Sequence, residues 1–118
     1  MEQRIIKFRA WDERHKEMWY PVKAGISGLK SHDILERYEI VMQFTGLTDK
    51  NGKEIYEGDI VDCYFSEPSV GIVRYEVFFD EEEAMFKLRN NLGYCMLTHR
   101  TIEILIVGSM YSNPELIK

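Results

Sequence analysis

Hydrophobic and polar residues alternate along most of the chain in short runs, which polar turns separate. Residues 4–11 place Ile6, Phe8 and Ala10 on one face and Arg9 on the other. Successive side chains of a strand point to opposite faces of a sheet, so this pattern predicts a half-buried β-strand.

A polar loop and a second short strand follow. Residues 12–17, DERHKE, are all polar, and residues 18–22 predict a returning strand that contains Pro21. Proline lacks the amide hydrogen that a central strand donates, so this hairpin is expected at a sheet edge. Trp11 and Trp19 flank the loop and are therefore predicted to be cross-strand neighbours.

The centre of the chain, residues 43–61, reads QFTGLTDKNGKEIYEGDIV. Asn51-Gly52 tolerates the positive φ angles of a tight turn and predicts a hairpin between residues 40–47 and 55–56. Seven residues further on, the turn Glu57-Gly58-Asp59 leads into another apolar run. Two turns at this spacing predict a small β-meander.

The rest of the chain continues the same pattern. Further strands are predicted at residues 38–44, 60–65, 70–79, 92–97 and 101–107, with residues 84–89 as a strand or short helix. Short helical turns are expected at residues 31–35 and after Asn113, where Pro114 suits the first helical position. The fold class is therefore mainly β: a curved antiparallel meander forming a half-open barrel, with one or two short helical turns.

The size and charge of the chain limit the classes of protein to which it can belong. At 118 residues the chain predicts one domain over residues 1–118. No apolar run approaches the roughly 20 residues that cross a bilayer, and the N-terminus does not resemble a secretory segment, so we expect a cytoplasmic protein. A net charge of −5 weighs against non-specific binding to nucleic acid.

The residues that most often bind metals or act as nucleophiles are scattered. Cys63 and Cys95 have no metal-ligand spacing and are expected as small buried side chains; a disulfide would require neighbouring strands and an oxidising compartment. The three histidines, His15, His32 and His99, also form no motif. The acidic run 80–83 lacks the order of a calcium loop and is expected as a solvated hairpin tip. We predict no metal, cofactor or catalytic constellation.

The turn Glu57-Gly58-Asp59 has two interpretations. Its two carboxylates could serve as an acid/base pair or a cation site. In the structural interpretation, Gly58 supplies an unusual backbone angle and Asp59 caps the turn by accepting from an amide two residues further on. We favour the structural interpretation, which predicts that Asp59→Ala lowers stability by roughly 1 kcal/mol.

Basic and aromatic residues concentrate in the N-terminal hairpin and suggest a binding face. Its candidate residues are Arg9, Trp11, Arg14, Lys16, Trp19 and Tyr20. These rings, with Tyr56 and Tyr111, could instead pack as core, which is the interpretation that we favour. An exposed aromatic face would suit a protein partner or nucleobase stacking.

Three stretches carry a family resemblance. The central TGLTDKNGKEIYEGDIV, the opening IIKFRAWDERHKEMWYP and the closing IEILIVGSMYSNPELI resemble the YopX family of small proteins, typically encoded by phages and prophages. The central motif residues are Thr45, Gly46, Leu47, Asp49, Asn51, Gly52, Ile55, Tyr56, Glu57, Gly58 and Asp59.

The resemblance implies a curved meander that forms part of a barrel, with association between chains. It implies no biochemical activity. We therefore expect a non-enzymatic, self-associating protein-interaction module of phage or prophage origin, with an unknown host or phage protein as partner. The alternative is a small nucleic-acid-binding barrel that uses the basic and aromatic N-terminal hairpin.

Overall fold

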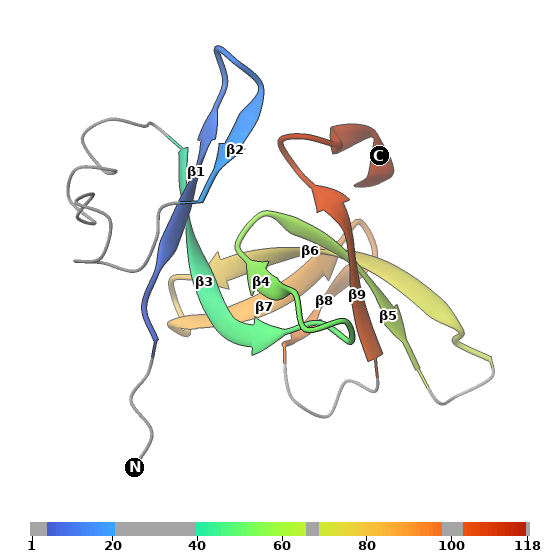
Figure 1. Cartoon of the computed structure of the whole chain (residues 1–118). Coiled ribbons are helices and arrows are strands. Elements are labelled where there is room, and N and C mark those ends of the chain that lie inside the picture. Colours follow the sequence, from blue (N-terminus) through green and yellow to red (C-terminus); the bar gives the residue numbers. More distant parts are fainter. Residues whose placement is uncertain (1–4, 21–39, 66–68, 98–102, 118) are drawn as a thin grey trace.

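A computed structural model describes residues 5–20, 40–65, 69–97 and 103–117. Within these ranges the chain forms nine strands and one short helical turn (Figure 1). They are β1 (Phe8–Asp12), β2 (Glu17–Trp19), β3 (Ile40–Thr48), β4 (Glu54–Tyr56), β5 (Asp59–Tyr64), β6 (Ile72–Asp80), β7 (Met85–Asn90), β8 (Gly93–Met96), β9 (Glu103–Ser109) and the 3-10 turn η1 (Pro114–Ile117). The helical turn expected at residues 31–35 lies outside the described residues.

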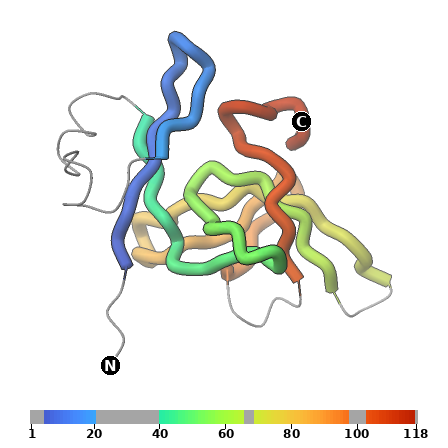
Figure 2. The backbone as a smooth tube through the Cα atoms, viewed as in Figure 1, coloured from blue at the N-terminus to red at the C-terminus, as the bar shows by residue number. Residues whose placement is uncertain are grey.

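The strands form two curled antiparallel sheets that together make a half-barrel. In the described ranges, one sheet has the order β2-β1-β3-β4 and the other the order β8-β7-β6-β5-β9. This arrangement confirms the mainly β fold class. Figure 2 shows the N-terminal hairpin and the C-terminal turn rising on the same side of the half-barrel.

Local turn chemistry placed most elements correctly. The Asn51-Gly52 turn connects β3 to its antiparallel partner β4, and Gly52 has a φ of 81°. Residues 84–89, which the sequence left open between strand and helix, contribute to strand β7. The turn that begins at Pro114 is also present, as η1.

The second turn of the central stretch does not continue a meander. Strands β4 and β5 belong to different sheets, so Glu57-Gly58-Asp59 is a corner between sheets. Gly58 has a φ of 84°, and a Cβ atom there would lie 3.0 Å from Met42 Sδ and 3.1 Å from Tyr111 Cε2. The corner therefore requires glycine both for its backbone angle and for its close packing.

The hydrophobic core lies mainly on the inner face of the second sheet. Its buried members are Ile55, Val61, Cys63, Val77, Leu88 and Ile104. Because Ile55 belongs to β4, this cluster also packs the first sheet against the second. The cluster thus joins β4 to the second sheet.

The loop between β3 and β4 closes over the outer edge of β9. Lys50 N donates to Ile104 O at 2.9 Å, and Ile106 N donates to Asp49 Oδ2 at 3.2 Å. Asp49 Oδ1 also accepts from the amides of Asn51 and Lys53, each at 2.9 Å. A single buried carboxylate therefore shapes the hairpin loop and attaches it to the other sheet.

Candidate functional site

A buried ion pair connects the two sheets at the Glu57-Gly58-Asp59 corner. Arg9 Nη2 on β1 lies 2.8 Å from Asp59 Oδ1 at the start of β5, and each side chain is 3% exposed. Arg9, one of the candidate residues of the suggested binding face, is therefore buried and not part of an exposed surface. Its charge is held inside the protein by a carboxylate fifty residues away.

Arg9 makes several further contacts around this pair. Its Nη1 donates to Tyr20 Oη at 3.2 Å, and its Nη2 donates to the carbonyl oxygen of Glu57 at 3.0 Å. The guanidinium carbon lies 4.8 Å from the centre of the Tyr56 ring. In the described part of the chain, however, the buried Nε of Arg9 has no hydrogen-bond partner.

Asp59 is positioned by its own strand and by the preceding one. Its Oδ2 accepts from Tyr56 N at 2.8 Å. It does cap the corner, but by bonding the amide three residues before it, not two residues after. Burial raises the pKa of Asp59 above its ordinary value, while the charge of Arg9 and the amide of Tyr56 lower it.

The neighbouring Glu57 has a different partner. Its Oε1 accepts from Gln43 N at 2.8 Å, so this carboxylate fastens the corner to β3. Asp59 is held by Arg9 and Tyr56. Each carboxylate therefore has a structural partner of its own, which favours the structural interpretation of the turn over an acid/base pair.

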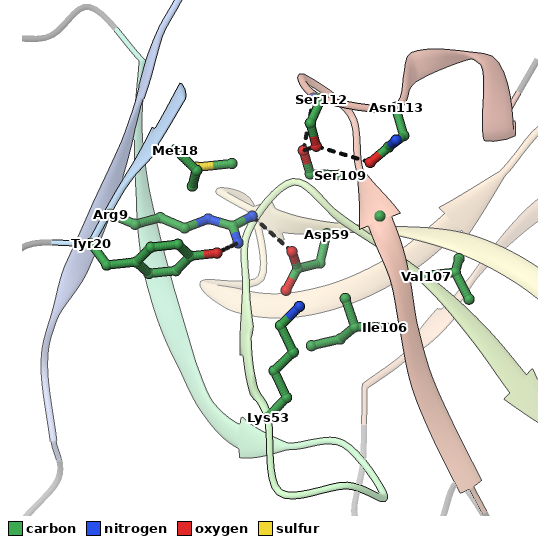
Figure 3. Close-up of a pocket in the computed structure, with 11 residues that line it drawn as sticks. Arg9, Met18, Tyr20, Lys53, Asp59, Ile106, Val107, Ser109, Ser112 and Asn113 are labelled. Carbon is green, nitrogen blue, oxygen red and sulfur yellow. Dashed lines mark hydrogen bonds and ion pairs between the residues drawn. The ribbon is translucent and has the colours of Figure 1, made fainter. Parts of the chain in front are cut away.

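Beside the ion pair lies a pocket of about 300 Å³ between the N-terminal hairpin, β9 and the C-terminal turn (Figure 3). It is lined by Arg9, Met18, Tyr20, Lys53, Asp59, Ile106, Val107, Gly108, Ser109, Ser112 and Asn113. Sequence reasoning named the residues of the hairpin and of the corner separately. The sequence did not predict that the hairpin and the corner contact the C-terminal turn, because no local pattern indicates contacts between segments so far apart in the chain.

Hydroxyl and amide groups form the C-terminal side of the pocket. The Oγ atoms of Ser109 and Ser112 lie 2.7 Å apart, and Ser112 Oγ donates to Asn113 Oδ1 at 3.0 Å. The Ser109 Oγ also accepts from the backbone amide of Ser112 at 3.0 Å. This network holds the turn that follows β9 in a fixed shape.

The rest of the predicted binding face divides into buried and exposed residues. Trp11 is 4% exposed and its ring stacks on Tyr111, with 6.2 Å between ring centres. The register of β1 and β2 pairs Trp11 with Met18, and Trp19 with Ala10, so the predicted Trp11–Trp19 pair is wrong. Four residues of the predicted face do lie at the surface: Arg14, Lys16, Trp19 and Tyr20.

The two cysteines are free thiols on strands that are not adjacent. Cys63 lies on β5 and Cys95 on β8, with β6 and β7 between them. Burial raises the pKa of the Cys63 thiol to about 12 and also raises that of Cys95. Thiols with raised pKa values are weak nucleophiles at neutral pH, so neither cysteine has the character of a catalytic group.

The remaining candidates have structural partners as well. Asp80 begins the turn between β6 and β7, where it accepts from Glu82 N at 2.9 Å and from Lys87 Nζ at 2.7 Å. Across the described ranges, no group of three or more His, Cys, Asp or Glu side chains is placed to hold a metal ion. His32 and His99 lie outside the described residues.

Fold and site together define a small half-barrel β protein with a buried ion pair between its sheets. The sequence model of a family described as YopX protein matches residues 7–118, so the chain belongs to the YopX family, as its motifs predict. A similar solved structure is the crystal structure of protein EF1440 from Enterococcus faecalis. It has 26% sequence identity and a TM-score of 0.63, covering 98% of this chain and 100% of that one.

The search of curated proteins found no match. In the described part of the chain, none of the helical segments has the length and apolar character needed to span a membrane.

Proposed function

We propose that this YopX-family chain, of phage or prophage origin, is a non-enzymatic protein-interaction module of the host cytoplasm that associates with itself through strand β8. One observation carries the proposal: β8 is an edge strand with large apolar residues at the surface. On β8, Tyr94 is 71% exposed and Met96 53%, and Leu92, in the turn just before the strand, is 91% exposed. No charged residue occurs between residues 91 and 98.

The other edge strands are protected, which makes β8 distinct. The outer edge of β9 is covered by the loop that contains Asp49 and Lys50. On β4, the amide of Tyr56 donates to the Asp59 carboxylate. Strand β2 is only three residues long and begins with the charged Glu17. Proteins commonly protect edge strands by covers, charges and short lengths; among the residues that the structure describes, none covers the outer edge of β8, and the strand carries no charge.

A second copy of the chain is the partner that fits this edge. Two β8 strands that pair antiparallel about a two-fold axis would join their sheets and place both copies of Tyr94 and Met96 at the contact. Such pairing satisfies the free backbone groups of both edges at once. A protein partner from the host or phage could then bind the assembled form.

Light scattering across a range of protein concentrations tests self-association. We expect the unmodified chain to form at least dimers, and Met96→Glu to shift it towards the monomer. Glutamate at this position lies opposite Lys87 within one chain, so the fold is preserved while a charge is added to the edge.

Ile72→Glu is the matched control, because Ile72 is 58% exposed but lies on β6, an interior strand of the same sheet. We expect this variant to associate like the unmodified chain. A monomer at every concentration for the unmodified protein would overturn the proposal.

The nucleic-acid alternative is less well supported. Arg9 and Trp11, two of the six residues proposed for it, are buried. The exposed Lys16 forms an ion pair with Glu13, which reduces the positive charge of the hairpin. Binding of DNA or RNA that weakens steeply with added salt would nevertheless favour this alternative over self-association alone.

A further inference from the structure

We propose that the pocket beside the Arg9–Asp59 pair binds a small organic monocarboxylate. This inference is independent of self-association, because no pocket residue belongs to β8. The pocket has a volume of about 300 Å³, which is at the lower end of the range for small-molecule sites. Its walls come from segments far apart in the sequence, and Figure 3 shows the side chains of Arg9, Lys53 and Asp59 pointing towards one another.

The charge balance of the pocket indicates a ligand with one negative charge. Arg9 and Lys53 are the two cations of the lining, and Asp59 is its one carboxylate. One positive charge is therefore in excess. A dianion such as a phosphate monoester would leave a negative charge unmatched close to Asp59, whereas a carboxylate would neutralise the excess.

Arg9 supplies the donor that most clearly points to a ligand. Its side chain is 3% exposed and lines the pocket, yet its Nε has no hydrogen-bond partner among the described residues. A buried donor without an acceptor costs free energy. Because Nε is closed to solvent in this conformation, a carboxylate oxygen removes that cost only when the Arg9 side chain shifts towards the pocket. Asp59 does not supply this acceptor in the structure: its Oδ1 lies against Arg9 Nη2 and its Oδ2 accepts from Tyr56 N, while Nε has no partner among the described residues.

Lys53 and the C-terminal turn supply the remaining polar groups of the proposed carboxylate site. Lys53 comes from the hairpin loop and extends its amino group towards Asp59 (Figure 3). Ser109, Ser112 and Asn113 place hydroxyl and amide groups on the opposite wall. Met18 and Ile106 add apolar surface, so a short acid with a small apolar or hydroxyl-bearing chain fits the lining better than a bare inorganic anion.

Two-dimensional NMR of the full chain tests this directly, with propionate and lactate as probes. We expect millimolar additions of either probe to shift the Arg9 Nε–H signal and the amide signals of Ser109 to Asn113. Propionamide has nearly the same shape but no charge, and we expect it to shift none of these signals. Equal shifts from propionamide would overturn the proposal, and so would no shift from any carboxylate.

Two lysine variants separate charge recognition from folding. Lys53→Met removes the exposed cation of the pocket, and we expect it to weaken propionate binding about tenfold. Lys50→Met is the matched control, because Lys50 lies in the same loop but outside the pocket, beside Glu103. If both variants bind propionate as the unmodified chain does, or if both weaken it equally, the assigned site is wrong.

Discussion

The guanidinium of Arg9 and the carboxylate of Asp59, 2.8 Å apart, connect the two sheets of the half-barrel at the corner between β4 and β5. Both side chains are almost fully buried, so the two charges depend on each other for compensation. A buried pair of this kind is weak evidence of net stabilisation. Removing one partner is nevertheless costly, since the other charge is then left unpaired.

Arg9→Met is therefore expected to lower the free energy of unfolding by about 3 to 5 kcal/mol. Asp59→Ala should have an effect of similar size, well above the roughly 1 kcal/mol that a turn cap alone predicts. Urea unfolding followed by tryptophan fluorescence would measure both changes, since Trp11 lies in the buried part of β1.

Arg74→Met provides the control for that experiment. Arg74 pairs with Asp62 through two hydrogen bonds on the outer face of the second sheet, and its side chain is 40% exposed. Exposed pairs contribute about 1 kcal/mol or less, so this variant should be nearly as stable as the unmodified chain. Equal losses in Arg9→Met and Arg74→Met would contradict a special role for the buried pair.

The pKa of Asp59 gives a pH dependence with a definite sign. Burial raises this pKa above the ordinary value of 3.8, so the folded chain holds the Asp59 proton more tightly than the unfolded chain. The contribution of Asp59 to stability is therefore largest below that value, and it falls as the pH rises through the folded pKa. Above the folded pKa it stays constant.

The Asp59→Asn variant has no carboxyl group to titrate at this position. Comparing it with the unmodified chain therefore isolates the contribution of the Asp59 carboxyl group to the pH dependence of stability. The difference in unfolding free energy between the unmodified chain and Asp59→Asn should shrink as the pH is raised from about 3 to 7. Urea titrations of both proteins at each pH would measure that difference. A difference that grows over the same range would mean that the charge of Arg9 outweighs burial and lowers the pKa of Asp59.

The sequence predicted those features that depend on neighbouring residues. The Asn51-Gly52 hairpin and the turn at Pro114 follow from the backbone preferences of the residues that form them. Strand alternation also identified β1 and the mainly β class. Each of these inferences needs only a few consecutive residues, and the structure confirms each of them.

The features that the sequence did not predict depend on contacts between distant segments. Alternation shows that Arg9 and Trp11 share one face of β1, but not that the C-terminal turn covers that face. A charged residue suggests solvent exposure unless its partner is known, and Asp59 lies on another sheet. The prediction that the chain continues as a meander through the turn at Gly58 was wrong for the same reason. Turn chemistry does not specify which sheet the next strand joins.

Asp49 supports a third prediction, because it attaches the hairpin loop to β9. Asp49→Ala would leave the amides of Asn51, Lys53 and Ile106 without their acceptor, and we expect a loss of about 3 kcal/mol in unfolding free energy. Hydrogen exchange should also become faster at the Ile106 amide. Asp49→Asn keeps one side-chain oxygen as an acceptor, so its loss of unfolding free energy should be smaller. If the Ile106 amide exchanges at its original rate in both variants, Asp49 does not attach the loop to β9.

Gly108 supports the last prediction, through the close packing of the C-terminal turn on β9. A Cβ atom at this position would lie 2.7 Å from Asn113 Oδ1 and 2.8 Å from Leu116 Cδ1. Gly108→Ala should therefore push the turn away from β9 and cost about 1 to 3 kcal/mol, as overpacking does. The Asn113 amide, which donates to Ser109 O at 2.9 Å, should then exchange faster with solvent.

Gly46→Ala distinguishes this steric effect from backbone strain. Gly46 has a φ of 90° and open space where a Cβ would lie, so alanine there strains the backbone without touching the C-terminal turn. Both variants should be less stable in urea, but only Gly108→Ala should speed exchange at Asn113 and weaken propionate binding in the pocket that this turn lines. Unchanged exchange at Asn113 in Gly108→Ala would show that the turn adjusts to the added methyl group, and that its packing on Gly108 does not set the shape of the pocket.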